Sequence, residues 1–232
     1  GLQKNDLALL NIIAANKWKR PIYFTTPLSG SEGVGIEKYY RKDGLSYRLV
    51  PVEGDIINAD WMKDKVMNKF GFGNADVKGV YYDEENRRHL LTIRTAYAEL
   101  ASYLSDKGRK DEAKEVLEKC DKMMLQENFA YGMTSRSAPS HNRVTLLFLD
   151  ACYRAGDKEL VAKVSASVKK DLQQQLRYYN SLSGWKADNL SNDKQMAENF
   201  LRAMEQMEQA YTAKVAAPEN GKVIGDSGKA KK

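Results

Sequence analysis

Two histidines could provide metal or general-base chemistry in this chain. His89 and His141 each stand alone near the beginning of an expected long helix, outside any HExxH or HxxxH spacing. A metal site requires several such ligands together. We therefore interpret both histidines as surface or cap-proximal residues and expect no metal ion.

Two cysteines allow a thiol or a disulfide. Cys120 and Cys152 fall on apolar faces of expected helices, where a free cysteine behaves as a small hydrophobe. Their positions in a weak internal repeat could also bring them close enough to pair in an oxidising compartment. The sequence leaves both states open.

Clustered glycines and paired carboxylates are the remaining residues that could form a phosphate-binding or catalytic site. Gly30, Gly33 and Gly35 run as GxxGxG, whereas a dinucleotide fingerprint needs GxGxxG between a strand and a helix. The acidic pairs lie on expected helix starts and solvated faces, and no GxSxG, Cys with His or kinase motif is present. We therefore assign no catalytic, cofactor-binding or metal residue, and expect the chain itself to be non-catalytic and without a cofactor.

Aromatic and basic residues crowd the first part of the chain: Trp18, Arg20, Tyr23, Tyr39, Tyr40, Tyr47 and Arg48. Such mixtures are enriched both in small cores and at protein interfaces. We favour core and sheet packing for most of them, with Arg20 and Arg48 reaching outward. The candidates for a docking role are Trp18, Arg20, Tyr47 and Arg48.

Composition predicts a folded chain that does not bind nucleic acid. The 232 residues are 42% hydrophobic and carry a net charge of +6. Residues 214–232 hold five lysines against Glu219 and Asp226, or +3, and the remaining +3 is interpreted as dispersed among acids. Apolar stretches are shorter than the roughly 18 residues that cross a bilayer.

The secondary-structure elements expected to position any site are short and mixed in the first part of the chain and long and helical in the second. A helix ending before Pro21, a strand over residues 22–26, a helical turn over 37–41, a strand over 45–52 and a helix over 59–70 come first. Long amphipathic helices follow at residues 83–107, 110–124, 140–154, 157–181 and 191–214.

A repeat with an offset of 48 residues relates Gly108 to Gly156. Around the first glycine the spacing of large and small apolar residues resembles the tetratricopeptide pattern, and the second hairpin matches it less well. We predict a mainly α fold of tetratricopeptide-like hairpins preceded by a small α/β subdomain with a two-stranded sheet. The α/β subdomain spans residues 1–82, the helical domain spans residues 83–215, and a flexible basic tail spans residues 216–232. The predicted seam between hairpins comprises Leu100, Leu104, Leu117, Phe148 and Leu149.

Several ordered blocks resemble one bacterial family: residues 11–24, 44–51, 67–74 and 79–88. The family consists of large multi-spanning membrane proteins of unknown function, similar to protein O-mannosyltransferases, and the blocks resemble its C-terminal soluble region. The resemblance covers about residues 3–182 and leaves residues 183–232 unassigned. It implies that this chain is a part of a longer protein and lies on the extracytoplasmic, periplasmic side. The parent's lipid-sugar-dependent transferase residues would lie elsewhere, so none is carried over to this chain.

Three functions follow as hypotheses, of which a self-contained enzyme ranks last. The first is a non-catalytic accessory domain of a membrane glycosyltransferase-like protein that docks a polypeptide acceptor, a partner or the transmembrane half. The alternative is a stand-alone tetratricopeptide-type scaffold that binds a peptide on a concave helical face. Neither involves nucleic acid or membrane insertion of this chain.

Overall fold

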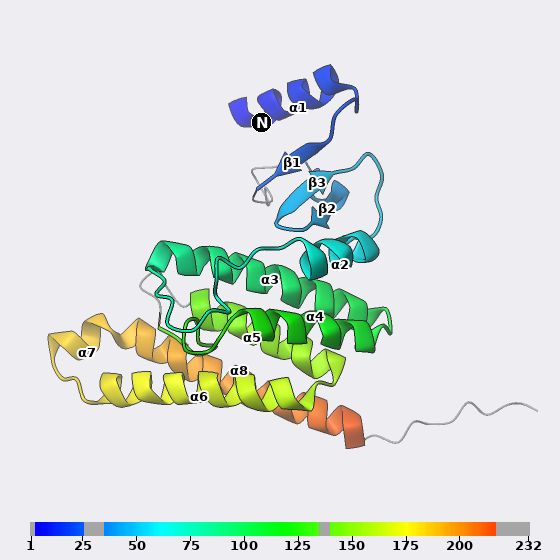
Figure 1. The fold of residues 1–232 in the computed structure, drawn as a ribbon. Helices are drawn as coiled ribbons and strands as arrows, with labels where there is room; N and C mark the ends of the chain where they lie inside the picture. The colour runs from blue at the N-terminus through cyan, green and yellow to red at the C-terminus, as the bar shows by residue number, and fades with distance from the viewer. Residues whose placement is uncertain (1–2, 26–34, 135–139, 217–232) are drawn as a thin grey trace, which may run out of the picture.

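The computed structural model describes residues 3–25, 35–134 and 140–216, which form a mainly helical fold with a small antiparallel sheet near the N-terminus (Figure 1). The expected loop positions Gly30 and Gly33 and the tail from residue 217 lie outside the described residues. The elements are α1 Lys4–Asn16, β1 Ile22–Phe24, the 3-10 helix η2 Glu37–Tyr39, β2 Tyr40–Asp43, β3 Ser46–Leu49, α2 Ala59–Asn68, α3 Glu84–Asp106, α4 Lys110–Met123, α5 Ser140–Ala155, α6 Lys158–Asn180, α7 Trp185–Asn189 and α8 Ser191–Ala216.

The sheet has three strands in the order β1-β3-β2, so the predicted two-stranded sheet is wrong by one strand. Tyr40 pairs with Leu49 and Asp43 with Ser46 around a tight turn, in which Gly44 has a φ of +68°. A residue without a Cβ adopts this backbone without strain. The turn folds residues 40–43 back on β3, whereas the sequence suggested a helical turn through residue 41.

The helical half agrees closely with the predicted helices. Asp83 caps α3 by accepting the Asn86 N–H at 2.8 Å, and Asp157 caps α6 by accepting the Leu160 N–H at 3.0 Å. Gly108 and Gly156 take φ values of +79° and +74° at the turns of the α3–α4 and α5–α6 hairpins. Two helical hairpins are therefore present at the predicted offset, and their tetratricopeptide-like character stays a prediction.

One continuous apolar core runs from Ile57 to Met204. The predicted seam is confirmed, because all five of its residues are at most 1% exposed. Met62 and Val66 of α2 belong to this same core, and the Tyr97 hydroxyl of α3 donates to the Val66 carbonyl. Cys120 and Cys152 are buried, free thiols, and burial raises the pKa of both.

The α4–α5 segment, described over residues 124–134, is irregular and also part of this core. Phe129 and Tyr131 are fully buried there, although the segment has no backbone ladder to satisfy its carbonyls. Arg94 of α3 donates to the Phe129 carbonyl at 3.1 Å and lies 4.3 Å from the Phe129 ring centroid. Side chains from the surrounding helices therefore replace the hydrogen bonds that secondary structure would provide.

His141 supports the same segment from the first turn of α5. Its Nε2 lies 2.8 Å from the Ala130 carbonyl and 3.1 Å from that of Tyr131, so Nε2 carries the donated hydrogen. Burial and the Arg94 charge lower the pKa of His141 from 6.5 to about 4. His89 is exposed and His141 lies in the first turn of α5, so both agree with the expectation of surface or cap-proximal histidines. His141 is nevertheless buried, because the α4–α5 segment covers it.

This pKa predicts a stability loss in mild acid. The unfolded chain protonates His141 near pH 6.5 and the folded chain only near pH 4, so unfolding becomes easier as the pH falls between these values. Denaturant titrations should show about 1 kcal/mol less stability at about pH 5.5 than at about pH 7.5 from this group. His141→Gln should flatten the curve in that window, and His89→Gln should leave its slope unchanged. Equal slopes in the wild type and His141→Gln would contradict a buried neutral imidazole.

Candidate functional site

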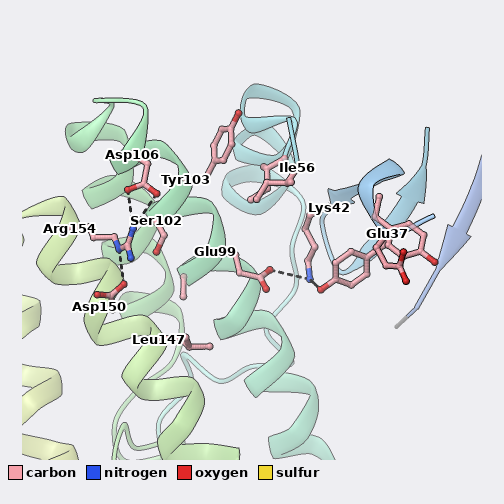
Figure 2. Close-up of a pocket in the computed structure, with 14 residues that line it drawn as sticks. Glu37, Lys42, Ile56, Glu99, Ser102, Tyr103, Asp106, Leu147, Asp150 and Arg154 are labelled. Carbon is pink, nitrogen blue, oxygen red and sulfur yellow. Dashed lines mark hydrogen bonds and ion pairs between the residues drawn. The ribbon is translucent and has the colours of Figure 1, made fainter. Parts of the chain in front are cut away.

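An open cleft of about 610 Å³ lies between the sheet and the helical array. One wall comes from η2, β2, β3 and residues 56–57, and the other from α3 and α5 (Figure 2). Its size falls in the range of small-molecule and peptide side-chain pockets. Its lining consists of Glu37, Tyr40, Lys42, Tyr47, Ile56, Ile57, Ala98, Glu99, Ser102, Tyr103, Asp106, Leu147, Asp150 and Arg154.

Lys42 joins the two walls at one end of the cleft. Its Nζ lies 3.1 Å from the Glu99 carboxylate on α3 and donates to the Tyr47 hydroxyl at 3.1 Å (Figure 2). Its backbone N–H donates to the Ile56 carbonyl at 2.7 Å, which fixes residues 56–57 beside β2. Lys42 is buried and its charge is paired, so it fastens the wall instead of offering a free ammonium group.

Arg154 organises the other end. Its guanidinium donates to Asp106 of α3 at 3.0 and 3.2 Å and to Asp150 of α5 at 2.6 Å (Figure 2). The hydrogen bond that Arg154 donates to Asp150 is the largest cause that raises the pKa of Arg154. Tyr211 of α8 also donates to Asp150 at 2.8 Å, and burial followed by this carboxylate raises the pKa of Tyr211 to about 12. The C-terminal part of α8 therefore contacts this end of the cleft through the hydrogen bond from Tyr211 to Asp150.

Between these charged ends the cleft exposes apolar surface. Ile56 and Leu147 are 65% and 49% exposed and line the cleft together with Tyr103. Four carboxylates and two cations line the cleft, which gives 2 − 4 = −2. A ligand that carries apolar groups and positive charge fits this lining.

The lining offers little for covalent chemistry. Its described residues include no histidine or cysteine, and both cations are held by carboxylates. The carboxylates nearest to Ser102 along α3, Glu99 and Asp106, are paired with Lys42 and Arg154. Within residues 3–25, 35–134 and 140–216, no three His, Cys, Asp or Glu side chains gather as a metal site. The arrangement is suited to binding.

The structure separates the four predicted docking residues. Tyr47 lines the cleft, but Arg48 projects from the other face of β3, because neighbouring strand residues alternate. Trp18 and Arg20 lie in the turn after α1, and neither lines the cleft. Only Tyr47 is therefore part of this site.

Sequence reasoning missed most of the cleft residues. Asp106 and Arg154 had a usable signal, because each lies two residues before a repeat glycine and the two are 48 positions apart. Their ion pair joins equivalent ends of the two hairpins. Lys42 and Glu99 are 57 positions apart and belong to different kinds of element, so no local pattern pairs them.

Comparison with known families bears on one wall of this cleft. A family model described as TMEM260-associated domain 2 matches residues 1–68, the stretch that contains α1, the sheet and α2. It covers the sequence blocks at residues 11–24 and 44–51, and residues 69–182 of the resemblance lie outside it. No curated protein and no solved structure matches the chain. Among the described residues, no helix combines the length and apolarity that crossing a bilayer requires.

Proposed function

We propose that this chain is a non-catalytic accessory domain of a larger, glycosyltransferase-like membrane protein and docks a polypeptide in the cleft between the sheet and helices α3 and α5. The TMEM260-associated match over residues 1–68 supports an accessory domain of a larger membrane protein. The extracytoplasmic location and the glycosyltransferase activity of the parent rest on the family resemblance.

The observation that supports docking is an exposed apolar surface in a cleft with carboxylates at both ends. Ile56 and Leu147 remain exposed although the core beside them is closed. Carboxylates at both ends of the cleft favour a cationic ligand, while the chain as a whole has a net charge of +6. A polypeptide segment with alternating apolar and basic side chains satisfies both requirements.

Peptide binding tests this proposal directly. Fluorescence anisotropy in physiological salt should compare two labelled peptides of equal length, one of leucine and lysine and one of leucine and glutamate. We expect the leucine and lysine peptide to bind about tenfold more tightly. This difference in affinity is informative, because the positive net charge of the whole chain would by itself favour the leucine and glutamate peptide.

Variants locate the binding. Ile56→Ser with Leu147→Ser should weaken binding of the leucine and lysine peptide about tenfold, because both side chains are exposed and their loss removes contact area but little core. Val52→Ser with Val77→Ser, at two exposed valines outside the lining, is the matched control. Equal affinities in both double variants would contradict the cleft as the site. Binding lost only by changes on the α6 or α8 surface would favour the stand-alone scaffold.

A further inference from the structure

Helix α1 has apolar residues on nearly every side, yet the fold covers only one of them. Asp6 and Leu9 are buried, whereas Leu7 is 50% exposed and Leu10 and Ile12 are also exposed. Leu7, Leu10 and Ala14 follow each other at spacings of three and four, so they form one exposed apolar stripe along the helix. A helix that is apolar all round is normally covered.

The turn after α1 exposes Trp18 to solvent and has a strained backbone. Lys17 and Trp18 have φ values of +46° and +58°, a region that bulky side chains avoid. Asn16 fixes this turn from both sides, because its Nδ2 donates to the Arg20 carbonyl at 2.6 Å and its Oδ1 accepts the Arg20 N–H at 3.1 Å. Trp18 is left 46% exposed next to the helix end. Strain of this kind concentrates at binding surfaces.

The charge around this turn is strongly positive. Residues 3–25 contain four bases and one acid, or 4 − 1 = +3, and the acid is the buried Asp6, which accepts the Gln3 N–H at 2.8 Å. With +3 in residues 214–232, residues 26–213 sum to 6 − 3 − 3 = 0. The expectation that the surplus outside the tail is dispersed is therefore wrong. In the described part of the chain, Lys17, Lys19 and Arg20 form no ion pair.

We infer that this surface, the α1 patch of Leu7, Leu10, Ala14, Lys17, Trp18, Lys19 and Arg20, lies in the headgroup region of an anionic membrane. Exposed leucines and a tryptophan suit the boundary between headgroups and acyl chains, and unpaired lysines suit anionic phosphates. A protein partner fits less well, because lysine is depleted at protein interfaces. Contact is peripheral, and α1 lies across the sheet from helices α6 and α8, so a bound membrane leaves the helical array free (Figure 1).

Vesicle cosedimentation of the full 232-residue chain tests this inference. We expect binding to vesicles of phosphatidylcholine mixed with phosphatidylglycerol, and at least tenfold weaker binding to phosphatidylcholine alone. Replacing Lys17, Lys19 and Arg20 by glutamine should reduce partition onto the anionic vesicles on the order of 100-fold, since each base near the surface contributes about fivefold. Trp18→Ala should reduce it several-fold.

A matched control lies at the far end of α6 and α8. Trp185 is exposed beside Lys186, as Trp18 is beside Lys17, and Trp185→Ala with Lys186→Gln should leave vesicle binding unchanged. A chain with Trp61→Phe and Trp185→Phe retains Trp18 as its single tryptophan, and brominated lipids should quench its fluorescence. This measurement reports contact even if the triple glutamine variant is unstable.

Three results would overturn the inference. They are equal binding to neutral and anionic vesicles, unquenched Trp18 fluorescence on bound chain, and concentration-dependent dimerisation that Leu10→Asp abolishes in the absence of lipid. The last result would assign the stripe to a second copy of the chain. The cleft and the α1 patch share no residue, so peptide binding that persists without vesicle binding would leave the proposed function standing.

Discussion

Gly132→Ala is expected to lower the free energy of unfolding by about 3 kcal/mol. A Cβ at this position would lie 2.8 Å from the Asp171 Cβ and inside contact distance of the Ser167 carbonyl, both on α6. The obstructing atoms are the Ser167 backbone and the Asp171 Cβ, which helix α6 holds in place, so no flexible side-chain end can move aside. The segment must then withdraw from α6 and lose the hydrogen bond from the Gly132 N–H to the Ser167 hydroxyl, which is 3.0 Å long.

Gly71→Ala is the matched control, because a Cβ there meets no atom within 4 Å and Gly71 has no left-handed φ. Urea denaturation of both variants should show a change for Gly71→Ala of at most about 0.5 kcal/mol in either direction. Similar small effects for the two glycines would mean that the α4–α5 segment does not sit against α6 as described.

The second large effect is expected at Arg94. Arg94→Ala should cost roughly 3 to 5 kcal/mol, because it leaves a cavity between Phe129 and Tyr131 and removes the donor to the Phe129 carbonyl. Burial lowers the pKa of this guanidinium, yet its hydrogen bonds and two aromatic faces offset much of the dehydration. Arg94→Lys keeps a charge but loses the planar fork, so it should recover less than half of the loss.

Arg88→Ala on the exposed face of the same helix is the control. Its guanidinium pairs with Glu85 at 3.2 Å in a solvated position, where ion pairs contribute about 0.5 kcal/mol. Thermal and urea unfolding should therefore rank Arg94→Ala far below Arg88→Ala in stability. A loss below about 1 kcal/mol for Arg94→Ala would mean that the α4–α5 segment is not anchored through this side chain.

The long helices and their seam could be predicted from sequence because their signals are local. Helical periodicity placed α3 to α6 within about two residues of their observed bounds, and the glycines at 108 and 156 marked both hairpin turns. Leu100, Leu117 and Phe148 were assigned to the core because repetition every three to four residues selects one face. The third strand was missed because η2 continues directly into β2, so a helical turn and a strand share residues 37–43.

The candidate site depended on information that the sequence does not present locally. Tyr47 was named for its aromatic neighbours, and its actual partner is Lys42 across a hairpin turn. Trp18 and Arg20 were named as docking residues with the sheet cluster, but the structure places them in the turn after α1, away from the cleft. The strained turn that contains these residues, and the lack of an ion pair for Arg20 among the described residues, can be recognised only from the backbone angles and ion pairs of the folded chain.

The sequence by itself determined the helices, the hairpin turns and the absence of recognisable catalytic motifs, since these depend on residue type and short-range spacing. Tertiary structure alone decided that Arg94 and His141 are buried, because an irregular segment packs over them and its carbonyls need donors. It also decided the cleft, where Lys42 pairs with Glu99 between the two walls and Asp106 pairs with Arg154 within one wall, over separations of 57 and 48 residues. Burial and long-range pairing depend on how elements pack together, and that packing is a property of the whole chain.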